Sequence, residues 1–189
     1  MSFEIIVEAL KLPFREEDWI GTMFAGSLLA LASLLVLPAP LFLGYVLRVM
    51  SQDDMPGFDN LVQMYIDGLK AFGVVTLYFL PGFIFIAAFD GILALTGFVL
   101  LVIGWWGMES GLYHLANGGF RQAFTVEALR TAFTLNYLIG IVASIVVPFA
   151  ITMAYSVSLL LLVTVLLFPT ALFYETVVRY RIMRNAIER

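Results

Sequence analysis

The sequence predicts an all-α, polytopic transmembrane helical bundle with about six crossings of the bilayer. The chain has 189 residues, of which 62% are hydrophobic, and a mean hydropathy of +0.99. A soluble domain of this size could not bury that much apolar surface. In addition, residues 131–174 contain no Asp, Glu, Lys, Arg or His. At about 1.5 Å per residue, this run is too long for one crossing of a hydrocarbon core about 30 Å thick, so we interpret it as two helices.

Composition also excludes several classes of site and partner. Cysteine is absent, which excludes disulfides, thiolate catalysis and Cys-ligated metals. The formal charge is −4 and there is no basic tract, which argues against nucleic-acid binding. The acidic N-terminal segment lacks the features of a secretory signal, so we expect it to be retained. We expect no cofactor and no metal; the expected partners are membrane lipids and either further copies of the chain or a larger membrane complex.

The first third of the chain predicts an interfacial helix followed by a hairpin. Apolar residues recur at helical spacing within residues 1–14, opposite charged ones, which predicts an amphipathic helix in the membrane interface or against the bundle. Residues 19–50 are largely apolar but are broken by Pro38-Ala39-Pro40. This stretch is either one long helix kinked at proline or a short hairpin.

The middle of the chain repeats the order of interfacial helix and span. A polar loop at 51–60 precedes an amphipathic helix over 58–70, which leads into a span over 71–88. A turn at Asp90-Gly91 then leads into a second span over 92–112.

The last third shows the same order again. A third amphipathic helix is predicted over 120–133, followed by spans over 134–153 and 156–178, with Tyr155-Ser156 near the turn between them. Residues 179–189 are predicted to form a basic tail. Together these elements make residues 1–189 a single integral membrane domain with three interfacial helices on the cytoplasmic side.

The placement of basic residues favours the hairpin over the single kinked helix. The chain has ten Lys and Arg residues: Lys11, Arg15, Arg48, Lys70, Arg121, Arg130, Arg179, Arg181, Arg184 and Arg189. A hairpin over 19–50 puts all of them on one face, whereas a single span would separate Lys11 and Arg15 from the others. The positive-inside rule makes that face cytoplasmic, with both termini inside the cell and the protein in the plasma membrane. Asp90 is then the only charged residue on the outer face.

Short motifs along the chain resemble one family. They are Leu12-Pro13-Phe14, Asp18-Trp19, Gly44-Tyr45 with Arg48, Pro56 with Phe58-Asp59, Asp67-Gly68-Leu69-Lys70-Ala71, Gly118-Gly119 before Ala123-Phe124, Tyr137-Leu138, and Phe168-Pro169 with Phe173-Tyr174. They are similar to signatures of the "domain of unknown function 4013" membrane proteins, which occur in salt-loving archaea and in bacteria. The resemblance implies a multi-helix membrane fold and carries over no catalytic residue.

Glu109 and His114 are candidate polar sites near the cytoplasmic end of a span. They lie five residues apart, which misses the i,i+4 spacing of a helical metal motif. With one His and no Cys, a zinc site would need carboxylates from elsewhere. We therefore favour the interpretation that Glu109 and His114 are two polar side chains at the membrane interface without a metal. A contact between Glu109 and either Arg48 or Arg130 is a comparable expectation.

The other polar candidates each have a structural interpretation beside the functional one. Asp90 is either an ion or proton site or, as we favour, the N-cap of the helix at Gly91. Arg48 either binds a lipid phosphate or, as we favour, snorkels to the interface. Asp67 is included as a candidate for lipid-head-group chemistry. Glu175 precedes Arg179 by four residues, which predicts an ordinary i,i+4 ion pair.

Small residues mark candidate helix-packing positions. Gly107 with Gly111, and Gly140 with Ser144, form small-xxx-small pairs that permit close approach of helices. We favour packing within the bundle over a dimer face.

Three function classes follow from these observations. The first, which we prefer, is a non-enzymatic membrane protein that acts as a scaffold, an accessory subunit or a membrane-organising protein. The second is a small-molecule or lipid transporter, since prolines interrupt several spans. The third is a membrane enzyme acting on lipid head groups through Glu109, His114 or Asp67.

Overall fold

The computed structural model describes residues 3–15, 18–33, 38–158 and 164–188. All regular secondary structure within these ranges is helical, as the sequence predicts. Among the described residues, three helices are long and apolar enough to cross a membrane: Leu61–Ala88, Ile92–Gly118 and Leu135–Met153. The protein is therefore a helical, membrane-type protein.

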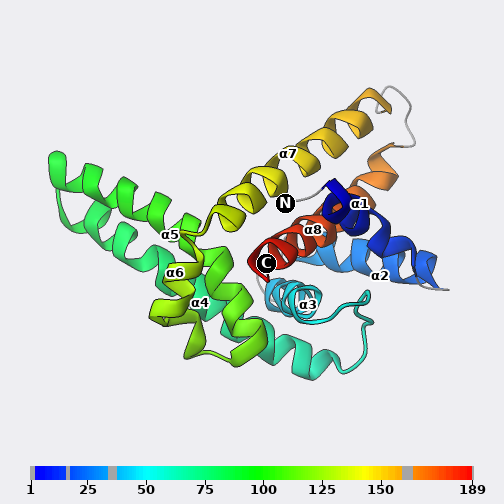
Figure 1. The fold of residues 1–189 in the computed structure, drawn as a ribbon, viewed down its shortest axis with the longest axis horizontal. Coiled ribbons are helices and arrows are strands. Elements are labelled where there is room, and N and C mark those ends of the chain that lie inside the picture. The colour runs from blue at the N-terminus through cyan, green and yellow to red at the C-terminus, as the bar shows by residue number, and fades with distance from the viewer. Residues whose placement is uncertain (1–2, 16–17, 34–37, 159–163, 189) are drawn as a thin grey trace.

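Helices α4 (Leu61–Ala88) and α5 (Ile92–Gly118) form a long hairpin that projects away from the rest of the molecule (Figure 1). They contain 28 and 27 residues, so each is about 40 Å long. An interfacial helix over 58–70 and a separate span over 71–88 were expected, but a single helix covers both from residue 61 onward. Nothing between Lys70 and Ala71 breaks helical geometry, so the amphipathic turns and the apolar turns join.

Helices α7 (Leu135–Ser158) and α8 (Thr164–Ile187) form a second hairpin. The turn expected at Tyr155-Ser156 is wrong, because α7 continues through Ser158 and the segment joining it to α8 lies outside the described residues. The expected basic tail is also wrong, because α8 continues to Ile187. Val178, Ile182 and Met183 are fully buried, so this last part of α8 belongs to the core.

The N-terminal third contains shorter helices. These are α1 (Phe3–Lys11), the 3-10 turn η1 (Leu12–Phe14), α2 (Trp19–Ala32) and α3 (Ala39–Ser51). Asp18 caps α2 by accepting a hydrogen bond from the Gly21 backbone N–H at 3.2 Å. Pro40 stands in the first turn of α3, where the missing N–H costs nothing. Helices α2 and α3 have 14 and 13 residues, so each is about 20 Å long, shorter than a full crossing.

The helix expected over 120–133 is shorter and divided. The structure has a 3-10 turn, η2 (Gln122–Phe124), followed by α6 (Val126–Thr131). Thr125 separates them in an extended conformation and caps α6 through a hydrogen bond from the Ala128 N–H, at 3.3 Å.

The core lies where the hairpins meet, around the C-terminal part of α8. We call this region, together with the loop of residues 52–60, the base. Next to the base, Tyr45 of α3 stacks on Phe58 with ring centroids 4.8 Å apart and packs against Phe173, near the middle of α8, at 5.2 Å. The α4–α5 hairpin beyond the base exposes large apolar side chains on several sides: Phe83, Ile84, Ile92, Leu95, Phe98, Val99, Val102 and Ile103. Such surfaces are typical of helices that face lipid or another membrane protein.

Candidate functional site

Glu109 and Arg179 form a partly buried ion pair at the base, which we call the ionic junction. Glu109 lies on α5 and is 2% exposed. The Arg179 guanidinium of α8 donates to its Oε1 atom through Nη2. The partner expected for Glu109 was Arg48 or Arg130, and the structure gives Arg179 instead. The junction thus ties the α4–α5 hairpin to the α7–α8 hairpin.

Hydrogen bonds to backbone carbonyls surround the junction. Tyr137 of α7 donates from its hydroxyl to the Trp106 carbonyl of α5. The Trp106 indole donates in turn to the Ala132 carbonyl at 2.8 Å, and Ser110 donates to the Ala128 carbonyl at 2.8 Å. These bonds fix α5 against α6 and the start of α7.

The junction retains unused hydrogen-bonding capacity. Among the described residues, the Glu109 Oε2 and Arg179 Nε atoms are buried and have no partner. Arg179 also lies over the Tyr180 ring, with its guanidinium carbon 5.5 Å from the ring centroid. The junction is therefore a single charged contact in which both partners keep an unused hydrogen-bonding atom.

A groove between α7 and α8 begins at Arg179 and has a volume of about 370 Å³. Its lining residues combine apolar and polar side chains: Ser144, Ile145, Pro148, Phe149, Thr152, Leu172, Glu175, Thr176 and Arg179. The Thr152 hydroxyl lies 2.5 Å from Glu175 Oε1. The expected ion pair between Glu175 and Arg179 is wrong, since no ion pair joins these two described residues and Arg179 turns to Glu109. Polar groups therefore extend from the junction along the two helices.

Arg48 lies at the end of α3 and braces the loop to α4. Its guanidinium donates to the carbonyl oxygens of Gly57, Asp59 and Asn60, at 3.1, 2.7 and 3.3 Å. It also lies 3.4 Å from the Asp59 carboxylate. The geometry therefore gives Arg48 a bracing role in the base.

Asp67 lies near the start of α4. It accepts from Lys70 at 2.7 Å and from the Gln63 amide at 3.0 Å. With Arg48 and Lys70 it lines a hollow of about 230 Å³ between α3, α4 and the end of α5.

His114 and Asp90 lie away from the ionic junction. The positions of Glu109 and His114 are about 140° apart around α5, because they are five residues apart in the sequence. The His114 ring faces Thr131 of α6, with Nε2 3.3 Å from the hydroxyl. Asp90 is exposed at the tip of the α4–α5 hairpin. The expected N-cap role of Asp90 is wrong, because Gly91 takes that position and no side chain caps the helix.

The small residues lie at helix contacts. A Cβ on Gly107 or Gly111 would come within 2.9 or 2.6 Å of the Tyr78 ring of α4. Gly140 of α7 faces Ala186 of α8, and Ser144, also on α7, is buried. Each contact lies within one chain.

Sequence reasoning missed the polar contacts made by the end of α8. Arg184 donates to the Gln52 carbonyl and lies 2.8 Å from Asp53 Oδ1 and 2.7 Å from Glu188. Arg181 donates to the Asp53 carbonyl. The available signal was a set of apolar residues at helical spacing on both sides of these arginines and between them: Val177, Val178, Ile182, Met183 and Ala186.

The described residues contain no group of three or more His, Cys, Asp or Glu that could hold a metal ion. Most charged side chains of the base are engaged with another part of the chain. The arrangement is suited to holding helices together and to binding polar groups.

The comparisons with known proteins give one match. The family model described as "Protein of unknown function (DUF4013)" matches residues 29–163, more than half of the chain. No curated protein and no solved structure matches the chain.

Proposed function

The chain belongs to the DUF4013 family of proteins of unknown function, and from this premise we propose that it is a non-enzymatic scaffold or accessory subunit in the plasma membrane. Its apolar hairpins would present surfaces to lipid and to a membrane partner or a second copy. The base would hold these hairpins at a fixed spacing.

The ionic junction is the observation that carries this proposal. Glu109 and Arg179 come from different hairpins and are 70 residues apart in the sequence. Loss of Arg179 would leave the buried Glu109 carboxylate without its counter-charge, which is destabilising, so the pair favours this arrangement of the two helices. Beyond the base, the α4–α5 hairpin has an exposed apolar surface that a membrane partner could contact.

The topology we propose has six crossings with both termini cytoplasmic. Helices α4, α5, α7 and α8 supply four of them. The shorter α2 and α3 supply a hairpin that needs local thinning of the bilayer or a re-entrant path. The amphipathic first turns of α4 and α6 would lie in the cytoplasmic interface, since Leu61, Val62 and Leu129 are exposed apolar residues there.

Cysteine labelling tests this topology, because the natural chain has no Cys. Single cysteines at Ser2 and Ser51 should be labelled from the cytoplasmic side, and a cysteine at Ala39 from the outside. Labelling of Ser2 and Ser51 from opposite sides would leave α2 and α3 as one crossing.

The scaffold function is tested by purification from native membrane in mild detergent. We expect the chain to co-purify with a protein partner or to self-associate. A photoreactive residue at Leu95, exposed on α5, should cross-link to that partner, whereas one at Glu127, exposed on α6, should not. A strictly monomeric particle with no cross-link from Leu95 would contradict the proposal.

The α7–α8 groove supports a second candidate function, the binding or transport of an amphiphile. Arg179 is paired with Glu109, but Glu175 has no ion pair among the described residues. A carboxylate beside Ile145, Phe149 and Leu172 suits an amphiphile with a cationic head.

Dodecylamine is a suitable probe for this second candidate. Native mass spectrometry should show that the chain retains it, and that Glu175→Gln loses it while Glu127→Gln keeps it. Equal retention by both variants would remove the candidate. The third class, a head-group enzyme, gains no support, because Glu109, His114 and Asp67 make separate contacts.

A further inference from the structure

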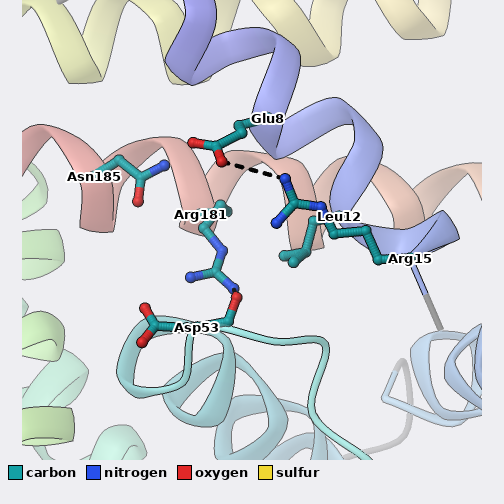
Figure 2. Close-up of a pocket in the computed structure, with 6 residues that line it drawn as sticks. All are labelled: Glu8, Leu12, Arg15, Asp53, Arg181 and Asn185. Carbon is teal, nitrogen blue, oxygen red and sulfur yellow. Dashed lines mark hydrogen bonds and ion pairs between the residues drawn. The ribbon is translucent and has the colours of Figure 1, made fainter.

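A small hollow of the base lies between η1 and the end of α1, the loop after α3, and the end of α8. It has a volume of about 160 Å³ and is lined by Glu8, Leu12, Arg15, Asp53, Arg181 and Asn185. Figure 2 shows these side chains converging from the three segments, with Arg181 crossing the hollow from α8 toward Asp53.

Arg181 is the unusual member of this group. It is 5% exposed, and no carboxylate among the described residues pairs with it. It donates to the backbone carbonyl of Asp53. Its Nε atom is buried and has no acceptor in the described part of the chain.

The two carboxylates at the hollow are engaged with other arginines. Asp53 lies 2.8 Å from Arg184, outside the hollow, and Glu8 lies 3.2 Å from Arg15. Arg181 therefore has a buried guanidinium with no carboxylate in direct contact, and the charges of Asp53 and Glu188, both held by Arg184, act on it only at longer range.

We propose that this hollow binds a phosphate group, held by the guanidiniums of Arg181 and Arg15 and by the Asn185 amide. Planar guanidinium groups recognise phosphate oxygens through paired hydrogen bonds. The phosphate would supply the direct ion-pair partner and the Nε acceptor that Arg181 lacks among the described residues. The half-exposed Arg15 would turn to the phosphate and leave Glu8, so Glu8 competes with the ligand for Arg15.

Two sources can supply such a phosphate group, a lipid head group or a free phosphate. The lipid source rests on the proposed topology, which puts the base at the cytoplasmic interface. Binding of free phosphate does not depend on that topology. Separate probes therefore distinguish the sources and keep this inference independent of the scaffold function.

The test uses the full chain in a neutral detergent. One arm measures the shift in thermal unfolding with inorganic phosphate against chloride at equal ionic strength. The other measures retention of phosphatidylglycerol against a neutral diacylglycerol by native mass spectrometry. We expect at least one phosphate probe to bind, and its dissociation constant to rise about tenfold or more in Arg181→Lys and Arg15→Gln.

Two further variants make the test specific. Glu8→Gln removes the competitor and should tighten binding severalfold. Arg121→Gln removes an equal charge from an exposed position elsewhere and should leave binding unchanged. If Arg181→Lys does not fold, Arg15→Gln and Glu8→Gln decide the result, since both residues are largely on the surface. Binding of neither probe, or equal binding by the wild type, Arg15→Gln and Glu8→Gln, would overturn the proposal.

Discussion

The Arg179 guanidinium of α8 donates to the Glu109 carboxylate of α5, and this contact joins two apolar hairpins. Glu109 is almost fully buried, whereas the Arg179 side chain is about one-third exposed. The pair therefore combines a buried charge with a partner that also reaches the α7–α8 groove.

Removing one partner of the junction should destabilise the protein by about 1–3 kcal/mol, less than for a fully buried pair because solvent reaches Arg179. Glu109→Gln and Arg179→Gln should each show this loss in detergent unfolding curves. The double variant should recover part of it, because no unpaired charge remains. The exposed residues Glu127 and Arg130 supply a control cycle. Additive losses at Glu109 and Arg179 would show that the pair does not couple the helices.

The contact between Glu109 and Arg179 could not be predicted from the sequence. Their separation of 70 residues gives no local rule for pairing, and Glu109 had several basic candidates. The helical class and the apolar hairpins were predictable, because uninterrupted apolar runs depend only on composition and length.

The end of the chain was predicted incorrectly for an identifiable reason. Four arginines in residues 179–189 indicated a solvated tail, yet Ile182, Met183 and Ala186 continue the apolar face of α8. Likewise, residues 155–163 contain neither Gly nor Pro, so the sequence offers no strong turn signal at Tyr155-Ser156.

Arg184 should hold the loop between α3 and α4 closed. Its guanidinium binds both the Gln52 carbonyl and the Asp53 carboxylate, so Arg184→Gln should speed proteinase K cleavage within residues 51–60 severalfold. Asp53→Asn should change the rate little, because that carboxylate is mostly exposed and the Gln52 contact remains. Cleavage fragments are identified by mass spectrometry. Equal rates in Arg184→Gln and the wild type would show that another contact closes the loop.

The crossing of α3 and α4 should depend on Gly68. A Cβ there would lie 2.8 Å from the Gly44 backbone N and closer still to the Pro40 carbonyl. Gly68→Ala should therefore cost about 1–3 kcal/mol, because the two backbones must separate.

Gly73 is the matched control on the same helix. A Cβ at Gly73 meets only the Phe120 ring, at an ordinary 3.5 Å. Gly73→Ala should be neutral or stabilise by up to about 1 kcal/mol, since alanine is the better helix former. Unfolding curves of both variants are compared with the wild type. Equal effects of the two substitutions would argue against a tight crossing at Gly68.

The central claim is that the α4–α5 hairpin crosses the bilayer while the base lies on the cytoplasmic side. The most direct measurement labels single cysteines at Asp90, at the hairpin tip, and at Ser51, at the base, with an impermeant maleimide on intact cells. We predict that Asp90→Cys is labelled at once and that Ser51→Cys is labelled only after the membrane is permeabilised. Labelling of both positions from the same side would contradict the account.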